Sequence, residues 1–101
     1  MSEKNFLDLY HGKKSGILLF YGEMCVHSQK MMPEFHKAAE DADLPFFSIA
    51  SKDAAKAFQM MEEKGKEVVG FPMIYKFHKG EITEYIGDRS SNSFVNFAKA
   101  V

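Results

Sequence analysis

The sequence predicts an α/β protein with a mixed central sheet of about four strands flanked by about four helices. Three observations lead to this fold class. Strand-like and helical segments alternate along the chain, one five-residue run is apolar throughout, and a hairpin followed by a helix closes the sequence. Strands that alternate with helices pair in parallel, whereas a hairpin adds an antiparallel strand. Because no linker or repeat interrupts the chain, we expect a single domain over 1–101.

The first half of the chain is expected to hold two helices and a central strand. Residues 3–11 have the apolar spacing of a short helix, with Ser2 as its N-cap. The apolar run 17–21 lies between two glycines and is typical of a strand that is covered on both faces. A second helix is expected over 26–42, although Pro33 deletes one of its backbone hydrogen bonds and should kink it.

The second half continues the alternation and ends in a hairpin and a helix. The expected elements are a strand over 44–50, a helix over 52–64, strands over 73–77 and 82–86, and a helix over 90–100. Lys79-Gly80, between the last two strands, is typical of a tight hairpin turn. This order places helices on both faces of the sheet.

The composition disfavours several classes of function. Thirteen lysine and arginine residues stand against fourteen aspartate and glutamate residues with the charges interspersed, so we expect no nucleic-acid partner. The longest apolar run is far shorter than the ~20 residues of a membrane span, so we expect no membrane contact. Residues 1–5 lack a signal-peptide core, and a complete chain would therefore be cytoplasmic or otherwise non-secreted.

Cys25 is the only cysteine of the chain, which excludes an intrachain disulfide and a cysteine-cluster zinc site. It follows the apolar strand and lies in the first turn of the next helix, where free backbone N–H groups and the helix dipole favour a thiolate. Protonated His27 would strengthen this effect, and Ser28 would direct its hydroxyl toward the sulfur. The alternative is that Cys25 is a small apolar residue packed beneath the helix.

Residues 18–35 resemble the active-site strand, Cys-x-x-Cys turn and kinked helix of the thioredoxin-like superfamily, with Ser28 in place of the second cysteine. In that family a proline follows the second cysteine position by five residues, as Pro33 follows Ser28. Residues 69–81 resemble the family's cis-proline loop and hairpin. Residues 85–89 resemble the Y-x-G-x-R ending of protein disulfide isomerase domains. The sequence is therefore most similar to a single disulfide isomerase or thioredoxin domain with a monothiol Cys-x-x-Ser motif.

The resemblance implies a thioredoxin fold whose first strand is missing, because too few residues precede the first predicted helix. It also implies substrate-binding residues. In this family the residue before the cis-proline offers its backbone to a substrate peptide beside the reactive sulfur, which assigns that edge to Phe71 and Pro72. Met24, Val26 and Gly87 are expected to line it. From the residues alone, the Phe71–Pro72 bond would be expected to be trans.

Departures from the family pattern predict slow turnover. Leu19 stands where the family has a buried acid that moves a proton during exchange, and Met24 replaces a tryptophan. General acid–base catalysis contributes about 10²–10⁴-fold where it is used. Ser28 cannot resolve a mixed disulfide as a second cysteine would. A mixed disulfide on Cys25 must therefore be released by an outside thiol such as glutathione, or by another thiol of the substrate.

Two functions stay open at this point. The first is thiol–disulfide exchange through Cys25, His27 and Ser28, by isomerisation or with glutathione as co-substrate rather than by net dithiol redox. The second is a non-catalytic peptide-binding or chaperone module on the same fold. In either case we expect protein or peptide partners and a monomer. If the chain is a domain excised from a longer protein, the resemblance implies the endoplasmic reticulum.

No resident cofactor or metal is expected. The histidines outside the motif, His11, His36 and His78, show no spacing that would form a two-ligand metal face. A glutathione-bridged iron–sulfur cluster is disfavoured because Val26-His27 does not match the Cys-Gly-Phe-Ser motif of the glutaredoxins that hold one.

Overall fold

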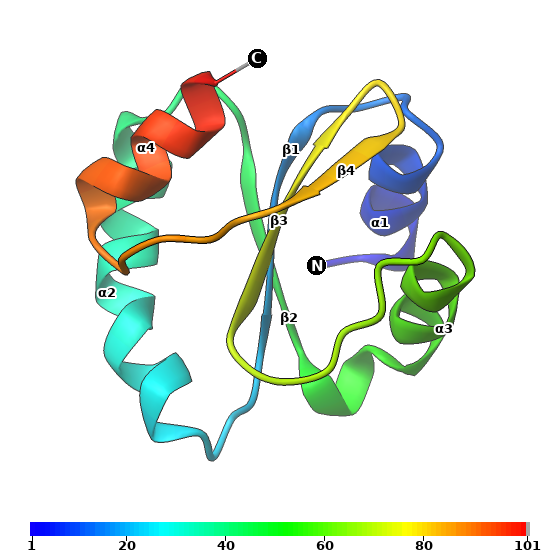
Figure 1. Ribbon diagram of the computed structural model, residues 1–101, viewed down its shortest axis with the longest axis horizontal. Helices are drawn as coiled ribbons and strands as arrows, with labels where there is room; N and C mark the ends of the chain where they lie inside the picture. Colours follow the sequence, from blue (N-terminus) through cyan, green and yellow to red (C-terminus); the bar gives the residue numbers. More distant parts are fainter. Residues whose placement is uncertain (101) are drawn as a thin grey trace.

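The computed structural model describes residues 1–100 and confirms a mixed sheet with helices on both faces (Figure 1). The strands lie in the order β2-β1-β3-β4. Their bounds are β1 Gly16–Tyr21, β2 Phe46–Ala50, β3 Met73–His78 and β4 Glu81–Glu84. β1 and β2 run parallel, and the other two pairs are antiparallel. Among the described residues no strand precedes the first helix.

The helices divide between the two faces of the sheet (Figure 1). Their bounds are α1 Glu3–Tyr10, α2 Val26–Asp41, α3 Ala55–Glu63 and α4 Ser91–Lys99. α2 and α4 cover one face, and α1 and α3 cover the other. Ser2 caps α1 as predicted, because its Oγ accepts a hydrogen bond from the Asn5 backbone N–H at 3.1 Å. α2 continues through Pro33 as one helix.

β1 is apolar throughout because each face of the sheet has its own core. Successive side chains of a strand point to opposite faces. Leu18 and Phe20 belong to the cluster beneath α1 and α3, whereas Ile17 and Leu19 belong to the cluster beneath α2 and α4. The expectation that this strand is covered on both sides is confirmed.

Three elements differ from the predictions by more than one residue. The strand expected over 44–50 begins at Phe46, because Pro45 accepts a hydrogen bond from Ile17 but has no N–H to donate. The helix expected over 52–64 is split into a 3₁₀ turn, η1 (Ser51–Asp53), and α3. Ala54 N–H donates three residues back to Ser51, which closes the turn before α3 begins.

The strand expected over 82–86 ends at Glu84. Tyr85 still donates its N–H to the Ile74 carbonyl at 2.8 Å. Its ring, however, packs edge-on against Phe94 and Phe97 of α4, at 5.3 and 5.0 Å between centroids. This aromatic contact directs the chain away from the sheet toward α4 and leaves Ile86 exposed.

The predicted hairpin turn is confirmed. Lys79 and Gly80 both have positive φ, 51° and 83°, as a type I′ turn requires. Gly12 lies against this turn with φ 77°, and a Cβ there would come within 2.8 Å of the Gly80 nitrogen. A side chain at residue 12 would therefore separate the end of α1 from the hairpin.

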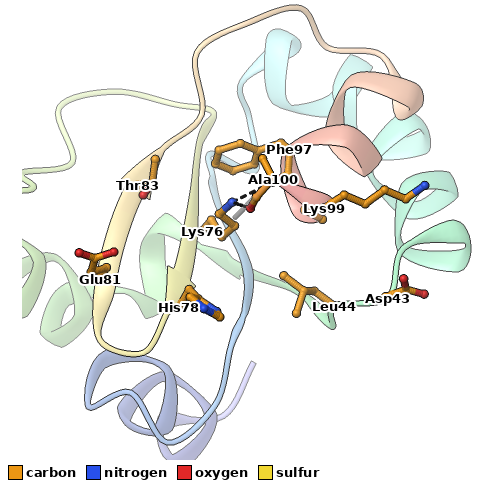
Figure 2. A pocket seen from close by; sticks show the side chains of 10 residues that line it. Asp43, Leu44, Lys76, His78, Glu81, Thr83, Phe97, Lys99 and Ala100 are labelled. Carbon is orange, nitrogen blue, oxygen red and sulfur yellow. Dashed lines mark hydrogen bonds between the residues drawn. The ribbon is translucent and has the colours of Figure 1, made fainter.

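A buried lysine binds the C-terminal end of α4 (Figure 2). Lys76 on β3 is 8% exposed, and its Nζ donates to the carbonyl oxygens of Phe97, at 3.1 Å, and of Ala100. The ammonium thus pairs with carbonyls that the helix end leaves free. The hollow around it, about 560 Å³, mixes both signs of charge and includes Asp43, Lys76, His78, Glu81 and Lys99.

Candidate functional site

Cys25 lies where β1 passes into α2. It is the N-cap of α2 and has extended backbone angles, φ −86° and ψ 119°. Its N–H donates to the Gly22 carbonyl at 3.1 Å, and its carbonyl accepts from Gln29 N–H at 3.0 Å. The turn is thus fixed by the strand end on one side and by the helix on the other. The side chain is half-buried.

The loop before Cys25 is anchored to two neighbouring elements. The Gln29 side chain donates to the Glu23 carbonyl at 2.8 Å. The Glu23 carboxylate lies 3.2 Å from the Lys52 ammonium, which follows β2. This ion pair raises the pKa of Lys52. The loop is therefore held beside the end of β2.

The start of α2 lowers the pKa of the Cys25 thiol below its ordinary value. The largest cause is the backbone N–H of Ser28, followed by its hydroxyl, the backbone N–H of His27 and the charge of Arg89, while burial acts in the opposite direction. The neutral thiol accepts no capping hydrogen bond, so these donors act on the thiolate. The thiolate is the nucleophilic form of cysteine.

Ser28 is the buried partner of Cys25. It is 1% exposed, and its Oγ accepts a hydrogen bond from Gly22 N–H at 3.2 Å. Because the oxygen serves as acceptor there, the hydroxyl proton is free to face the sulfur. His27 is exposed, and what it contributes to the Cys25 pKa is its backbone N–H.

The loop before β3 brings Phe71 and Pro72 to the same place. The Cys25 thiol donates to the Phe71 carbonyl with 3.8 Å between sulfur and oxygen. The Phe71–Pro72 peptide bond is cis. The Phe71 ring lies 5.9 Å from the Phe58 ring of α3 and is still 37% exposed. Backbone and side chain of this residue are thus both available beside the sulfur.

Several large apolar side chains are exposed, and two of them flank Cys25 in the chain. Met24 is 91% exposed and Val26 is 58% exposed, on either side of the cysteine. Val69 precedes the Phe71–Pro72 bond and Ile86 follows β4, with exposures of 78% and 87%. Adjacent exposed apolar residues such as Met24 and Val26 beside Cys25 mark interaction sites. The sequence predictions included Met24 and Val26 but not Val69 and Ile86, because an isolated apolar residue gives no sign of its exposure.

Gly87 and Arg89 extend the site toward α4. Gly87 is exposed and lines, together with Pro72 and Arg89, a cavity of about 90 Å³. The sequence reasoning assigned no role to Arg89, although the motif over 85–89 contained it. Its charge helps to lower the Cys25 pKa. Leu19, at the position of the family's acid, is fully buried in the sheet.

Among residues 1–100, no three His, Cys, Asp or Glu side chains are grouped so that they could hold a metal ion. No helix in this range is long and apolar enough to cross a membrane.

The family model named Thioredoxin matches residues 1–100. The chain is 31% identical over 104 residues to protein disulfide-isomerase 1 of Caenorhabditis elegans, covering 98% of this chain and 20% of that protein. It is 29% identical over 99 residues to protein disulfide isomerase-like 1-4 of Arabidopsis thaliana, covering 98% and 16% respectively. The chain thus spans about a fifth or less of the length of these curated relatives.

Solved structures agree with the family match. Thioredoxin from Aeropyrum pernix has a TM-score of 0.79 at 22% identity, over 98% of this chain and 82% of that one. The first thioredoxin domain of mouse protein disulfide-isomerase A4 has a TM-score of 0.72 at 27% identity, over 98% and 71%. The sheet order, the cysteine at the start of α2 and these matches lead to one conclusion: the chain belongs to the thioredoxin family.

Proposed function

We propose that this domain carries out thiol–disulfide exchange on protein and peptide substrates, with Cys25 as its single nucleophile. The observation that supports this most is the lowered pKa of Cys25 at the start of α2, beside the open Phe71 edge. Ser28 and the backbone of His27 stabilise the thiolate. Met24, Val26, Phe71, Pro72 and Gly87 form the substrate edge.

The exchange proceeds in two balanced steps. The Cys25 thiolate attacks one sulfur of a substrate disulfide, the S–S bond breaks, and the other sulfur leaves as a thiolate. Ser28 cannot displace the mixed disulfide because a hydroxyl is not a thiol. A second substrate thiolate that attacks the mixed disulfide releases Cys25 and leaves a rearranged disulfide. With glutathione as the attacking thiolate, the released product carries the glutathione and the overall step is an exchange.

The described residues of one copy supply every group named above, so we propose that a monomer suffices for the reaction. We also propose an oxidising compartment such as the endoplasmic reticulum as its location, because substrate disulfides persist there. The matches to disulfide isomerases from a nematode and a plant support the proposed location.

The test is covalent capture. Oxidised glutathione, or a peptide with one disulfide, should form a stable mixed disulfide with Cys25 that mass spectrometry detects and that reduced glutathione removes. Cys25→Ser is the null control. Absence of any adduct at a pH where an ordinary free cysteine peptide reacts would contradict the proposal.

A second function, peptide binding without turnover, is favoured by Leu19 and by the exposed apolar residues around Cys25. It predicts that Cys25→Ser suppresses the aggregation of an unfolded protein as well as the parent does. If it does so while covalent capture fails in the parent, the binding function replaces the exchange function.

A further inference from the structure

Met24 differs from the other methionines of the chain in the exposure of its side chain. Five of the seven methionines are buried in the two hydrophobic cores or pack against them: Met31, Met32, Met60, Met61 and Met73. Met1 is 37% exposed, whereas Met24 is 91% exposed. A thioether is oxidised where an oxidant reaches its sulfur. The fold therefore protects the five core methionines and leaves Met24 as the most accessible one.

The loop that carries Met24 is held by bonds on either side of this residue. The Glu23 carbonyl accepts from the Gln29 side chain at 2.8 Å, and the Cys25 N–H donates to the Gly22 carbonyl at 3.1 Å. The Glu23 carboxylate pairs with Lys52 at 3.2 Å. A change in the Met24 thioether therefore leaves the loop in place and alters the surface that it presents beside Cys25.

The adjacent sulfurs of Met24 and Cys25 differ in what restores them after oxidation. The sulfenic acid of a cysteine condenses with a thiol to give a disulfide, and a second thiol then releases the free cysteine. Methionine sulfoxide does not take part in this exchange and is reduced by methionine sulfoxide reductases. In the presence of thiols, oxidation of Met24 would therefore outlast oxidation of Cys25.

We propose that Met24 is a reversible oxidation site, and that its sulfoxide weakens substrate binding beside Cys25. The oxidant is a peroxide. Its O–O bond breaks, one oxygen forms a bond to the Met24 Sδ, and the other oxygen leaves as water, so that the sulfur is oxidised and the peroxide is reduced. The product is a polar side chain in place of a flexible apolar one. The effect on binding rests on the proposed function, which assigns Met24 to the substrate edge, whereas the oxidation itself does not.

The first experiment measures the order in which the methionines are oxidised. The Cys25→Ser variant is treated with limiting hydrogen peroxide, and the methionine peptides are quantified by mass spectrometry. We expect the Met24 sulfoxide to form first and those of Met31 and Met61 to form last. In the urea-unfolded chain all methionines should react at similar rates. Equal rates for Met24 and Met31 in the folded protein, or a Met24 sulfoxide that methionine sulfoxide reductases A and B leave unreduced, would overturn the proposal.

The second experiment measures the effect on binding. The parent is treated with peroxide and then with dithiothreitol, which restores Cys25 but not Met24. After removal of dithiothreitol, capture of a disulfide peptide with apolar residues beside its cysteines should be about three- to tenfold slower than before oxidation. Capture of oxidised glutathione should slow less, because this small disulfide offers fewer apolar contacts. An unchanged rate of peptide capture with Met24 fully oxidised would reject the role in binding.

Two variants assign the effect to residue 24. Each variant is compared with itself before and after peroxide treatment. Peptide capture by Met24→Leu should be insensitive to the treatment, whereas Met60→Leu should slow as the parent does. If Met24→Leu slowed equally, another residue would be responsible and the proposal would fail. If the untreated parent formed no adduct at all, the proposed function and the effect on binding would both fail, while the order of oxidation would still identify Met24 as the oxidation site.

Discussion

At the scale of single residues, Ser28 defines the chemistry open to Cys25. It is buried, it fixes the loop through Gly22, and it supplies the two largest contributions to the lowered Cys25 pKa. The same residue denies the site a second thiol. Ser28 thus accounts both for the lowered Cys25 pKa and for the absence of a second thiol beside Cys25.

Ser28→Ala should raise the pKa of Cys25 only part of the way back to its ordinary value, because the hydroxyl is lost while the larger backbone contribution stays. The pH dependence of alkylation by iodoacetamide measures this pKa. His27→Ala is the matched control and should move the midpoint less, since the backbone N–H of His27 remains. If His27→Ala raised the Cys25 pKa more than Ser28→Ala did, the His27 side chain and not the Ser28 hydroxyl would be the group that stabilises the thiolate.

Ser28→Cys should create a dithiol that reduces insulin disulfides when dithiothreitol is supplied, whereas the parent should not do so beyond background. The new thiol would stand where the Ser28 hydroxyl already faces Cys25, so that an internal disulfide can form. Insulin turbidity measures the activity, and the double variant Cys25→Ser with Ser28→Cys is the control. If Ser28→Cys stays inactive, the loss of the acid at Leu19 limits the site more than the loss of the thiol.

At the scale of elements, α4 is fixed to the fold by side chains from elsewhere. At its N-terminus the Glu34 carboxylate of α2 accepts from Ser91 N–H at 3.1 Å, and the Ser90 hydroxyl accepts from Ser93 N–H at 3.2 Å. At its C-terminus the Lys76 ammonium binds the last carbonyls. Because α2 carries Cys25 at its own start, the α2–α4 contact also supports the site.

Glu34→Ala should lower the free energy of unfolding by about 1 kcal/mol, the usual cost of losing a helix cap. Urea denaturation measures it. Glu40→Ala, at an exposed position on the same helix, is the matched control and should show no loss. Equal stabilities of the Glu34→Ala variant and the parent would mean that the Ser90 cap is sufficient.

Lys76→Met should destabilise the protein by about 1–3 kcal/mol, because it keeps the apolar stem but leaves the carbonyls of Phe97 and Ala100 without their charged donor. Hydrogen exchange should accelerate in α4 before it does in α2. Lys99→Met, at an exposed position, serves as the control. If the Lys76→Met variant were as stable as the parent, water would be an adequate partner for these carbonyls.

At the scale of the whole molecule, the sheet separates two cores. The core beneath α1 and α3 contains Tyr75, whose ionisation makes the free energy of unfolding depend on pH. Burial, aided by the Glu84 charge, raises the pKa of Tyr75 to about 12. A folded pKa above the unfolded value of about 10 means that the contribution of this residue is complete below pH 10. It is lost as the pH rises from about 10 to 12.

Tyr75→Phe should remove that loss. The stability of the variant relative to the parent should improve by about 1–2 kcal/mol between pH 9 and pH 12, after allowance for partial solvent access. Urea denaturation at several alkaline pH values measures the difference. If the free energies of unfolding of the variant and the parent differed by the same amount across this pH range, the ionisation of Tyr75 would not destabilise the fold.

Much of the fold could be predicted because local patterns suffice for it. The apolar run over 17–21, the Ser2 cap and the Lys79-Gly80 turn each follow from the residues within a few positions. The errors arose where distant contacts act. Tyr85 leaves the sheet because two rings of α4 bind it, and no neighbouring residue shows this.

The sequence by itself determined that the chain holds one cysteine, at a helix start after a buried strand, so that any mixed disulfide on it could be released only by a thiol from outside the chain. That conclusion needs only a residue count and a local helix signal. Only the tertiary structure decided which groups act on the sulfur, because the packing of the sheet brings together loops that are far apart in the chain: the Phe71 carbonyl and the Arg89 charge both come from such loops.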